Sequence, residues 1–257
     1  MTLIFEVMRG GGDNLAYIVG CQKKKKVAVV DPVASHAILE YCRDKKLEIL
    51  YVLNTHGHPD HTAGNDTIVK ATGAKVMAHS EDRPPGVDKT LKDGDEIEVG
   101  TRKIKVIHTP GHTSGSVCFQ INNKILSGDT LFLAGAGNTR FGGNVGDLFD
   151  SITRKIMPLS DKYTVHPGHD YSENNLRFAR TLEPENQSID HKLKELKNAS
   201  RNGHVVMSTI GEEKKYNPFF RFTEPEVLES IKSEFPEIEE SDPKEVFRHI
   251  RELRNNW

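Results

Sequence analysis

Hydrophobic and polar positions alternate in short runs through the first half of the chain. The runs LIFEVM, LAYIV and VAVVDP are separated by the glycine-rich turn GGGDN and the polar tip CQKKKK. Apolar runs of this length bounded by turn residues predict strands, here an antiparallel meander. The same pattern predicts further strands at LEILYVLNT, AKVMA, KVIHT, SVCFQI, KILSG and YTVH, and a hairpin around VGTRKI.

Helical spacing of apolar residues is interspersed among these strands and then replaces them. It predicts helices at HAILEYCRDKK, from about Gly64, and at DLFDSITRKIM. From about Tyr171 the chain predicts helices alone, at SENNLRFARTLE, SIDHKLKELKNAS, EPEVLESIKSEF and DPKEVFRHIRELRNN. The order predicts two similar halves that pack sheet against sheet with helices outside, followed by a helical region that helps to form the active site.

Charge and composition narrow the possible partners. The 257 residues include 35 basic and 37 acidic side chains, a net charge of -2, which predicts neither a nucleic-acid nor a membrane partner. No apolar stretch approaches the roughly 18 residues needed to cross a bilayer. Cys21, Cys42 and Cys118 share no short spacing, which is typical of a reducing compartment and excludes a cysteine zinc cluster. We therefore expect a cytoplasmic monomer, in which nitrogen and oxygen hold any metal.

Histidine and aspartate are concentrated where predicted strands end. The segment NTHGHPDHTAGN, residues 54–65, follows the strand LEILYVL directly, and three later loops, TPGHTSGS, LSGDTLF and VHPGHDY, also follow strands. Neutral imidazole is a preferred ligand of divalent metals, and small-residue loops at strand ends can bring distant ligands together. The candidate ligands are His56, His58, Asp60, His61, His112, Asp129 and His169.

Seven ligands exceed what one tetrahedral ion accepts and suggest a pair of ions. One plausible division assigns His56, His58 and His112 to one ion. It assigns Asp60, His61 and His169 to the second ion. Asp129 would bridge the two ions across roughly 3.5–4 Å.

These motifs resemble the metallo-β-lactamase superfamily, whose HxHxDH signature matches THGHPDH. Nearly the whole chain is similar to the glyoxalase II family, the hydroxyacylglutathione hydrolases, through GGDNLAYIV, VVDP, GDTLFLAGAG, GHDYSENNLRFARTLEPEN and KKYNPFFR. The resemblance implies an α+β fold, a four-layer αββα sandwich with a C-terminal helical appendage. It implies a catalytic domain at 1–172 and a helical substrate-binding region at 173–257. The seven candidates then become ligands of two divalent ions, zinc first, with iron or manganese as alternatives.

The resemblance also implies a reaction. It is the hydrolysis of a 2-hydroxyacyl thioester such as S-D-lactoylglutathione to D-lactate and glutathione, with Asp60 orienting the attacking water and Asp129 bridging the ions. Tyr171, Arg251 and Arg254 match family positions that bind glutathione. The family's third basic position, after GCG, is replaced here by GAGNTRFGGNVGD, in which Arg140 could substitute.

One other function fits the same scaffold. A persulfide dioxygenase would use a single ferrous ion held by two histidines and a carboxylate, the pattern of oxygen-activating iron. The GNTRFGGN loop favours this alternative, whereas the long helical C-terminus favours the hydrolase.

Overall fold

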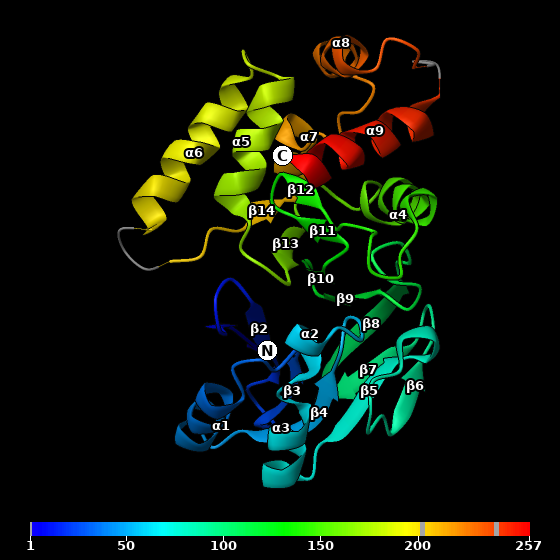
Figure 1. Ribbon diagram of the computed structural model, residues 1–257. Coiled ribbons are helices and arrows are strands. Elements are labelled where there is room, and N and C mark those ends of the chain that lie inside the picture. Colours follow the sequence, from blue (N-terminus) through cyan, green and yellow to red (C-terminus); the bar gives the residue numbers. More distant parts are fainter. Residues whose placement is uncertain (1, 201–203, 239–241) are drawn as a thin grey trace.

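Two six-stranded sheets form the centre of the computed structural model, which describes residues 2–200, 204–238 and 242–257 (Figure 1). The first sheet has the order β1-β2-β3-β4-β5-β6, made of Leu3–Arg9, Leu15–Cys21, Lys26–Val30, Glu48–Leu53, Lys75–His79 and Lys89–Leu91. The second has the order β14-β13-β10-β9-β8-β7, made of Ser208–Thr209, Thr164–Pro167, Lys124–Gly128, Val117–Ile121, Arg102–His108 and Glu96–Val99.

The pairing of neighbouring strands changes once within the first sheet, from antiparallel to parallel. β2 is antiparallel to both β1 and β3, which confirms the predicted meander, and β3 to β6 are parallel to one another. In the second sheet β7 to β10 are antiparallel and β10 pairs in parallel with β13. The carboxyl ends of β4, β10 and β13 all carry candidate ligands directly after them.

The two sheets pack face to face because residues alternate along their strands. On β2, Leu15 and Tyr17 belong to the core shared with the second sheet, in which Phe119 is completely buried. Their neighbours Ala16 and Ile18 face the opposite side and pack under helices. Both faces of β2 are buried, which explains its continuous apolar sequence.

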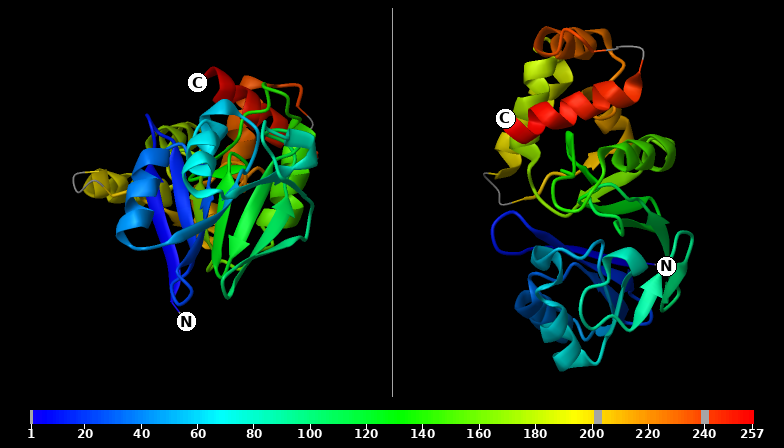
Figure 2. Two further views of the ribbon diagram at one scale, coloured as in Figure 1. Left: turned by 90° about the horizontal axis from the view of Figure 1, so that it is seen from below. Right: turned by 45° about the vertical axis from the view of Figure 1, so that its right-hand side comes forward.

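Helices cover the outer face of each sheet and complete the predicted αββα order. The first sheet is covered by α1 (Ser35–Asp44) and α3 (Asn65–Thr72), which lie at the end of the molecule opposite to the C-terminal helices (Figures 1 and 2). The second sheet packs against α4 (Val145–Ser151) and its continuation η2 (Ile152–Ile156). The predicted four-layer sandwich is thus confirmed.

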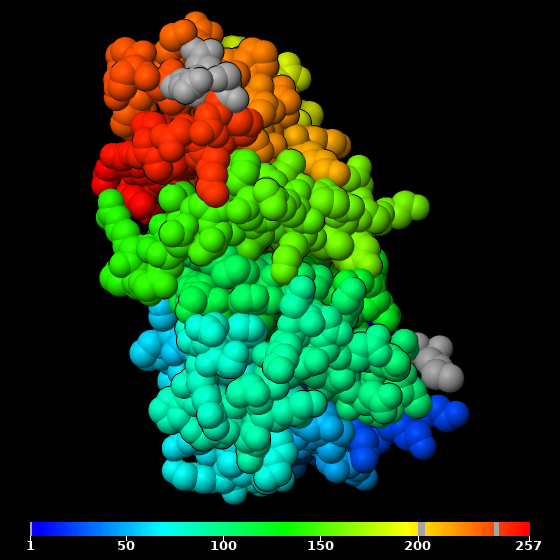
Figure 3. Space-filling view, turned by 90° about the vertical axis from the view of Figure 1, so that its right-hand side faces the viewer, coloured from blue at the N-terminus to red at the C-terminus, as the bar shows by residue number. Residues whose placement is uncertain are grey.

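The C-terminal part is helical, as predicted, and shares the outer core of the second sheet. It consists of α5 (Ser172–Leu182), α6 (Gln187–Ser200), α7 (Ile210–Tyr216), α8 (Pro225–Glu234) and α9 (Pro243–Asn256). Phe178 and Phe247 from these helices belong to one cluster with Ile125 and Val165 of the sheet. Figure 3 shows α9, in red, directly bordering the green central segment of the chain. The aromatic segment 216–222 fastens the helices to the sandwich, since Phe219 is completely buried there.

Several short elements depart from the sequence prediction. The helix predicted over DLFDSITRKIM is α4 followed by the wider π-type turns of η2. Further elements that the periodicity did not predict are α2 (Pro59–Thr62), η1 (Ser80–Asp82), β6, the hairpin β11–β12 (Leu131–Phe132 and Gly135–Ala136), α7 and β14. Within the described ranges, no helix combines the length and the apolar character needed to cross a membrane.

Candidate metal centre

The first four candidate ligands lie on a turn and a single helical turn after β4. Pro59 at the first position of α2 favours helix initiation there, and places Asp60 and His61 on successive helical residues. His56 and His58 lie in the preceding turn. His61 is buried at 1% side-chain exposure, whereas Asp60 is 51% exposed. The segment therefore presents one buried imidazole and one solvent-accessible carboxylate side by side.

The other three candidates come from loops on the second sheet. His112 lies in the β8–β9 loop, Asp129 directly follows β10, and His169 lies two residues after β13. All three are largely buried. The structure brings all seven candidates together at one rim of the sandwich, where loops of both sheets meet.

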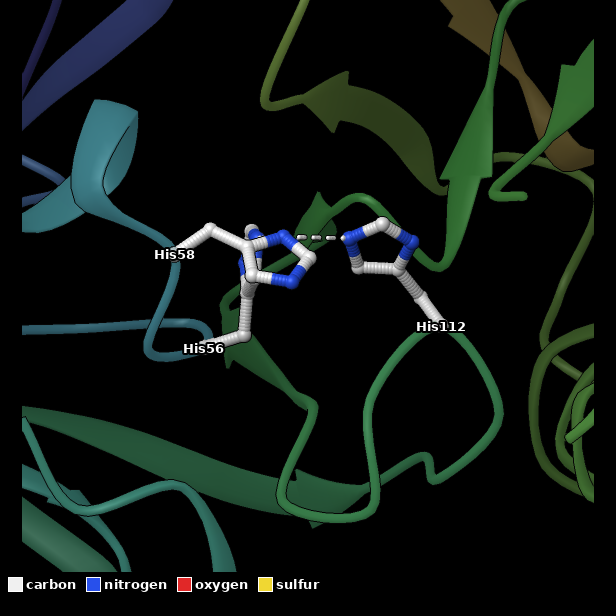
Figure 4. Close-up of side chains that lie close together, drawn as sticks. All are labelled: His56, His58 and His112. Carbon is white, nitrogen blue, oxygen red and sulfur yellow. Dashed lines mark hydrogen bonds between the residues drawn. The ribbon is translucent and has the colours of Figure 1, made fainter. Parts of the chain in front are cut away.

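Three histidines form the first cluster, shown in Figure 4. His56 Nε2 lies 3.0 Å from His58 Nδ1, and His58 Nδ1 lies 3.0 Å from His112 Nε2. Nitrogens bound about 2 Å from one tetrahedral ion lie about 3.3 Å apart, which is close to the spacing seen here. The three nitrogens converge on one point from two different loops.

The second cluster consists of Asp60, His61 and His169. His61 Nε2 lies 3.1 Å from His169 Nε2, and His169 Nε2 lies 3.3 Å from Asp60 Oδ2. Asp129 lies between the clusters: its Oδ1 is 3.4 Å from His61 Nε2, and its Oδ2 is 3.6 Å from His112 Nε2. These distances are compatible with two sites that share a carboxylate, and the division of the ligands between two ions stays a prediction.

These side chains fit divalent cations better than they fit one another. Among the residues that the structure describes, none donates a hydrogen bond to the buried Asp129 Oδ1. Burial and the neighbouring histidines hold the pKa of His56 well below its ordinary value, so this imidazole is neutral and offers a lone pair. Burial alone would also lower the pKa of His61, but the carboxylates of Asp129 and Asp31 raise it to about 9, because they attract positive charge to this imidazole. A divalent cation would supply that positive charge, so the cluster has the composition of a cation site.

The outward nitrogen of every one of the five histidines meets an oxygen. Such contacts fix the ring orientation and the tautomer of metal-binding histidines. The pairs are His56 Nδ1 with Thr55 Oγ1 (3.1 Å), His58 Nε2 with Phe141 O (3.4 Å), His61 Nδ1 with Asp31 Oδ2 (2.9 Å), His112 Nδ1 with Asn138 O (2.7 Å) and His169 Nδ1 with Asp13 Oδ1 (2.7 Å). In each ring the other nitrogen is left to face the centre.

Sequence reasoning assigned no role to Asp31 and Asp13. Asp31 also accepts hydrogen bonds from the Thr55 amide at 2.8 Å and the Thr55 hydroxyl at 2.6 Å, so one carboxylate supports two histidines. A signal was available, because VVDP places Asp31 directly after a buried strand, as the ligand loops do. Asp13, in the GGGDN turn, carried no such signal, since its partner is 156 residues away.

A pocket of about 330 Å³ lies beside this centre, and all four predicted substrate residues line it. They are Arg140, Tyr171, Arg251 and Arg254. The Tyr171 ring is stacked on the ligand His169, with centroids 4.9 Å apart, so the pocket adjoins the second cluster. Arg140 donates to Asn256 Oδ1 at 2.9 Å and thereby links the unusual GNTRFGGN loop to the end of α9.

The two arginines of α9 are not equivalent. Arg251 is only 6% exposed and donates from Nη1 to the carbonyl of Ala136 at 2.6 Å and to that of Gly137 at 3.3 Å. Arg254 is half-buried, and both of its protein hydrogen bonds go to Asn175 Oδ1. A guanidinium has five N–H donors, so Arg254 has donors left for a ligand. Arg251 instead holds the backbone of Ala136 and Gly137, and Gly137 packs against the Asp129 carbonyl oxygen.

The sandwich and its rim of histidines and aspartates define a protein of the metallo-β-lactamase superfamily, which residues 9–169 match directly. Residues 170–257 match the family described as hydroxyacylglutathione hydrolase C-terminus. A hydroxyacylglutathione hydrolase of a Polaromonas species is 39% identical over 251 residues, and that of Nitrosococcus oceani is 37% identical, each aligned over 95% of both chains. The chain therefore belongs to the hydroxyacylglutathione hydrolase family.

A solved structure agrees over the whole length. The crystal structure of ETHE1 from Myxococcus xanthus has a TM-score of 0.69 and 25% sequence identity, and the alignment covers 98% of each chain. The C-terminal helices are thus part of the shared architecture along with the sandwich.

Proposed function

We propose that this protein hydrolyses a 2-hydroxyacyl thioester of glutathione, such as S-D-lactoylglutathione, to D-lactate and glutathione. The observation that carries the proposal is the pair of ligand clusters joined by Asp129 and opening beside a pocket lined by three arginines. The curated relatives named hydroxyacylglutathione hydrolase match over almost the full chain and support the same reaction.

Two divalent ions, zinc in our proposal, would be held by the seven candidate ligands, three for each ion and Asp129 for both. When bound, such ions lower the pKa of a water molecule toward about 7 and polarise the substrate carbonyl. The donor set of imidazole and carboxylate suits zinc and also accepts iron or manganese.

Asp60 is the residue best suited to handle the proton of the attacking water. Burial opposes its ionisation, but His61 and the Asn14 amide lower its pKa below the ordinary value. Asn14 Nδ2 lies 3.3 Å from Asp60 Oδ2 and holds the carboxylate in place. Because the side chain is 51% exposed, water reaches it. An ionised and fixed carboxylate at the mouth of the centre can orient water and accept a proton.

The pocket for the thiol carrier is lined by residues of both the sandwich and the helical part. We propose that residues 1–172 form the catalytic domain and that residues 173–257 form a helical substrate-binding region, which adds Arg251 and Arg254 to the carrier site. Tyr171 and Phe132 form an aromatic wall, with ring centroids 5.3 Å apart, and Arg254 offers N–H donors to a carboxylate. Fixing the carrier at this wall holds the thioester beside the second cluster, which lowers the entropic cost of reaction.

The experiment is a comparison of two reactions on the metal-loaded protein. We expect thiol release from S-D-lactoylglutathione and no oxygen consumption with glutathione persulfide. Oxygen consumption with glutathione persulfide, without thiol release from S-D-lactoylglutathione, would refute the hydrolase proposal and support a persulfide dioxygenase. A panel of thioesters with other thiols tests whether glutathione is the carrier.

A further inference from the structure

One carboxylate oxygen lies between the two loops that supply the first histidine cluster. Asp82 ends η1, directly after β5, and its Oδ2 accepts the backbone N–H of Gly57 at 2.9 Å and the hydroxyl of Thr113 at 2.5 Å. Gly57 separates His56 from His58, and Thr113 follows His112. The same atom thus contacts the residue next to every histidine of this cluster.

The backbone around Asp82 is packed tightly against both loops. A Cβ added at Gly115 would lie 2.3 Å from the Asp82 Cβ and 2.5 Å from its backbone nitrogen. A Cβ at Gly57 would lie 3.0 Å from the Asp82 carbonyl oxygen. Real Cβ atoms do not approach other atoms as closely as the first two distances. The glycines of the motifs THGH and GHTSGS therefore make room for Asp82.

The Thr113 contact is itself held in place. The Ser116 hydroxyl lies 2.7 Å from Thr113 Oγ1, and it accepts the Thr113 amide at 3.1 Å. With its proton directed at Asp82, Thr113 Oγ1 remains free to accept from Ser116. The His112 loop is thereby closed on itself and attached to Asp82 at one point.

We propose that Asp82 is a positioning residue that holds His56, His58 and His112 in the arrangement that binds one ion. The His56 loop follows β4 of the first sheet and the His112 loop follows β8 of the second, so Asp82 joins loops of different sheets. Without that link, two separate loops lose conformational entropy each time the site fills. This inference rests on the proposed metal centre and is independent of the substrate.

The test measures metal binding by metal-free protein and by the Asp82→Ala variant. Zinc is titrated in competition with a chromophoric chelator, and Co²⁺ is titrated while its visible absorption is recorded. Loss of a residue that supports a ligand typically costs 10–100-fold in metal affinity. We expect a weakening of about 10–100-fold at one of two sites, with an altered Co²⁺ spectrum for that site and an unchanged second site.

The matched control is Asp88→Ala. Asp88 also accepts a backbone amide, that of Val76 at 2.9 Å, and pairs with Lys75 at 3.3 Å, but it contacts neither ligand loop. We expect both metal affinities and the Co²⁺ spectrum of this variant to equal those of the wild type.

Substitutions at Thr113 keep the inference testable if Asp82→Ala does not fold. Thr113→Val removes the hydroxyl at nearly constant shape and should weaken the same site, whereas Thr113→Ser should restore it. Wild-type affinities and spectra in Asp82→Ala and Thr113→Val, or an equal loss in Asp88→Ala, would overturn the role of Asp82. A wild-type chain that binds no ion would instead overturn the proposed metal centre and, with it, this inference.

Discussion

Replacing Arg254 with methionine should weaken substrate binding without slowing the chemical step. The guanidinium lines the pocket and donates two hydrogen bonds to Asn175 Oδ1, from Nε at 3.3 Å and from Nη2 at 3.1 Å. The family resemblance assigns this position to the glycine carboxylate of glutathione, which lies far from the thioester carbonyl. Methionine keeps much of the aliphatic volume and removes the charge.

The size of the effect follows from the interaction lost. A hydrogen bond to a charged group contributes about 1.5–3 kcal/mol, which is about 10- to 150-fold in kcat/KM. An interaction present equally in the bound substrate and the transition state changes KM and leaves kcat unchanged. We therefore expect the loss of kcat/KM to be carried by KM.

Steady-state thiol release from S-D-lactoylglutathione measures both constants. Arg248→Met is the matched control on the same helix, because Arg248 pairs with Glu245 at 2.8 Å and with Glu252 at 3.5 Å and does not line the pocket. A substrate whose glycine carboxylate is amidated should be hydrolysed equally by the wild type and Arg254→Met. An unchanged KM in Arg254→Met, or a fall in kcat at constant KM, would refute the reasoning.

Three further substitutions test two buried charged groups and the packing of the metal centre. Burial raises the pKa of Glu213 from 4.5 to about 7, so the stability that depends on the protonated carboxyl is fully present below about pH 4.5 and is lost as pH rises from there to about 7. Glu213→Gln should remove this loss, which reaches up to about 3 kcal/mol in urea unfolding. Arg221→Met leaves the 1% exposed Glu183 unpaired, which costs about 3–5 kcal/mol and lowers Tm by about 6–20 °C in calorimetry. Gly168→Ala places a Cβ 2.4 Å from Asp129 Oδ1, and chelator titration should show lost metal binding in a chain with unchanged circular dichroism.

Each of these has a control of the same chemical kind. For the exposed control Glu229→Gln, the free energy of unfolding should change with pH as it does in the wild type. The same pH dependence in Glu213→Gln would contradict the raised pKa of Glu213. Arg177→Met breaks an exposed ion pair with Glu173, which contributes at most about 1 kcal/mol to stability. An equally small loss of stability in Arg221→Met would contradict the predicted contribution of the buried Arg221–Glu183 pair. Gly11→Ala adds a methyl group with no heavy atom of the described chain within 4 Å, and should leave metal binding intact.

The strands and the ligand positions were predictable because they depend on local pattern. The short apolar run LAYIV between turn residues predicts a strand whatever its neighbours are, and β2 lies there. Histidines clustered after a buried strand indicate a metal site, and in the structure His58 Nδ1 lies 3.0 Å from both His56 Nε2 and His112 Nε2. The assignment of ions to these side chains is still a prediction.

The supporting residues could not be predicted, because their roles arise between distant segments. Asp82 acts on Thr113, 31 residues away, and no periodicity connects the two. Arg251 was expected to bind substrate, and its contact with the Ala136 carbonyl depends on how α9 packs on the β12 hairpin. The missed helix α7 did carry a local signal, since Thr209 and Glu212 form a capping box.

The central claim is that two ions held by one shared carboxylate hydrolyse the thioester. Zinc titrated into metal-free protein, with thiol release from S-D-lactoylglutathione and bound zinc measured at each step, tests it most directly. We predict that hydrolysis rises until two ions are bound per chain, and that Asp129→Ala loses hydrolysis together with metal binding. Protein that binds two ions and releases no thiol, or a fully active Asp129→Ala variant with both ions bound, would contradict the claim.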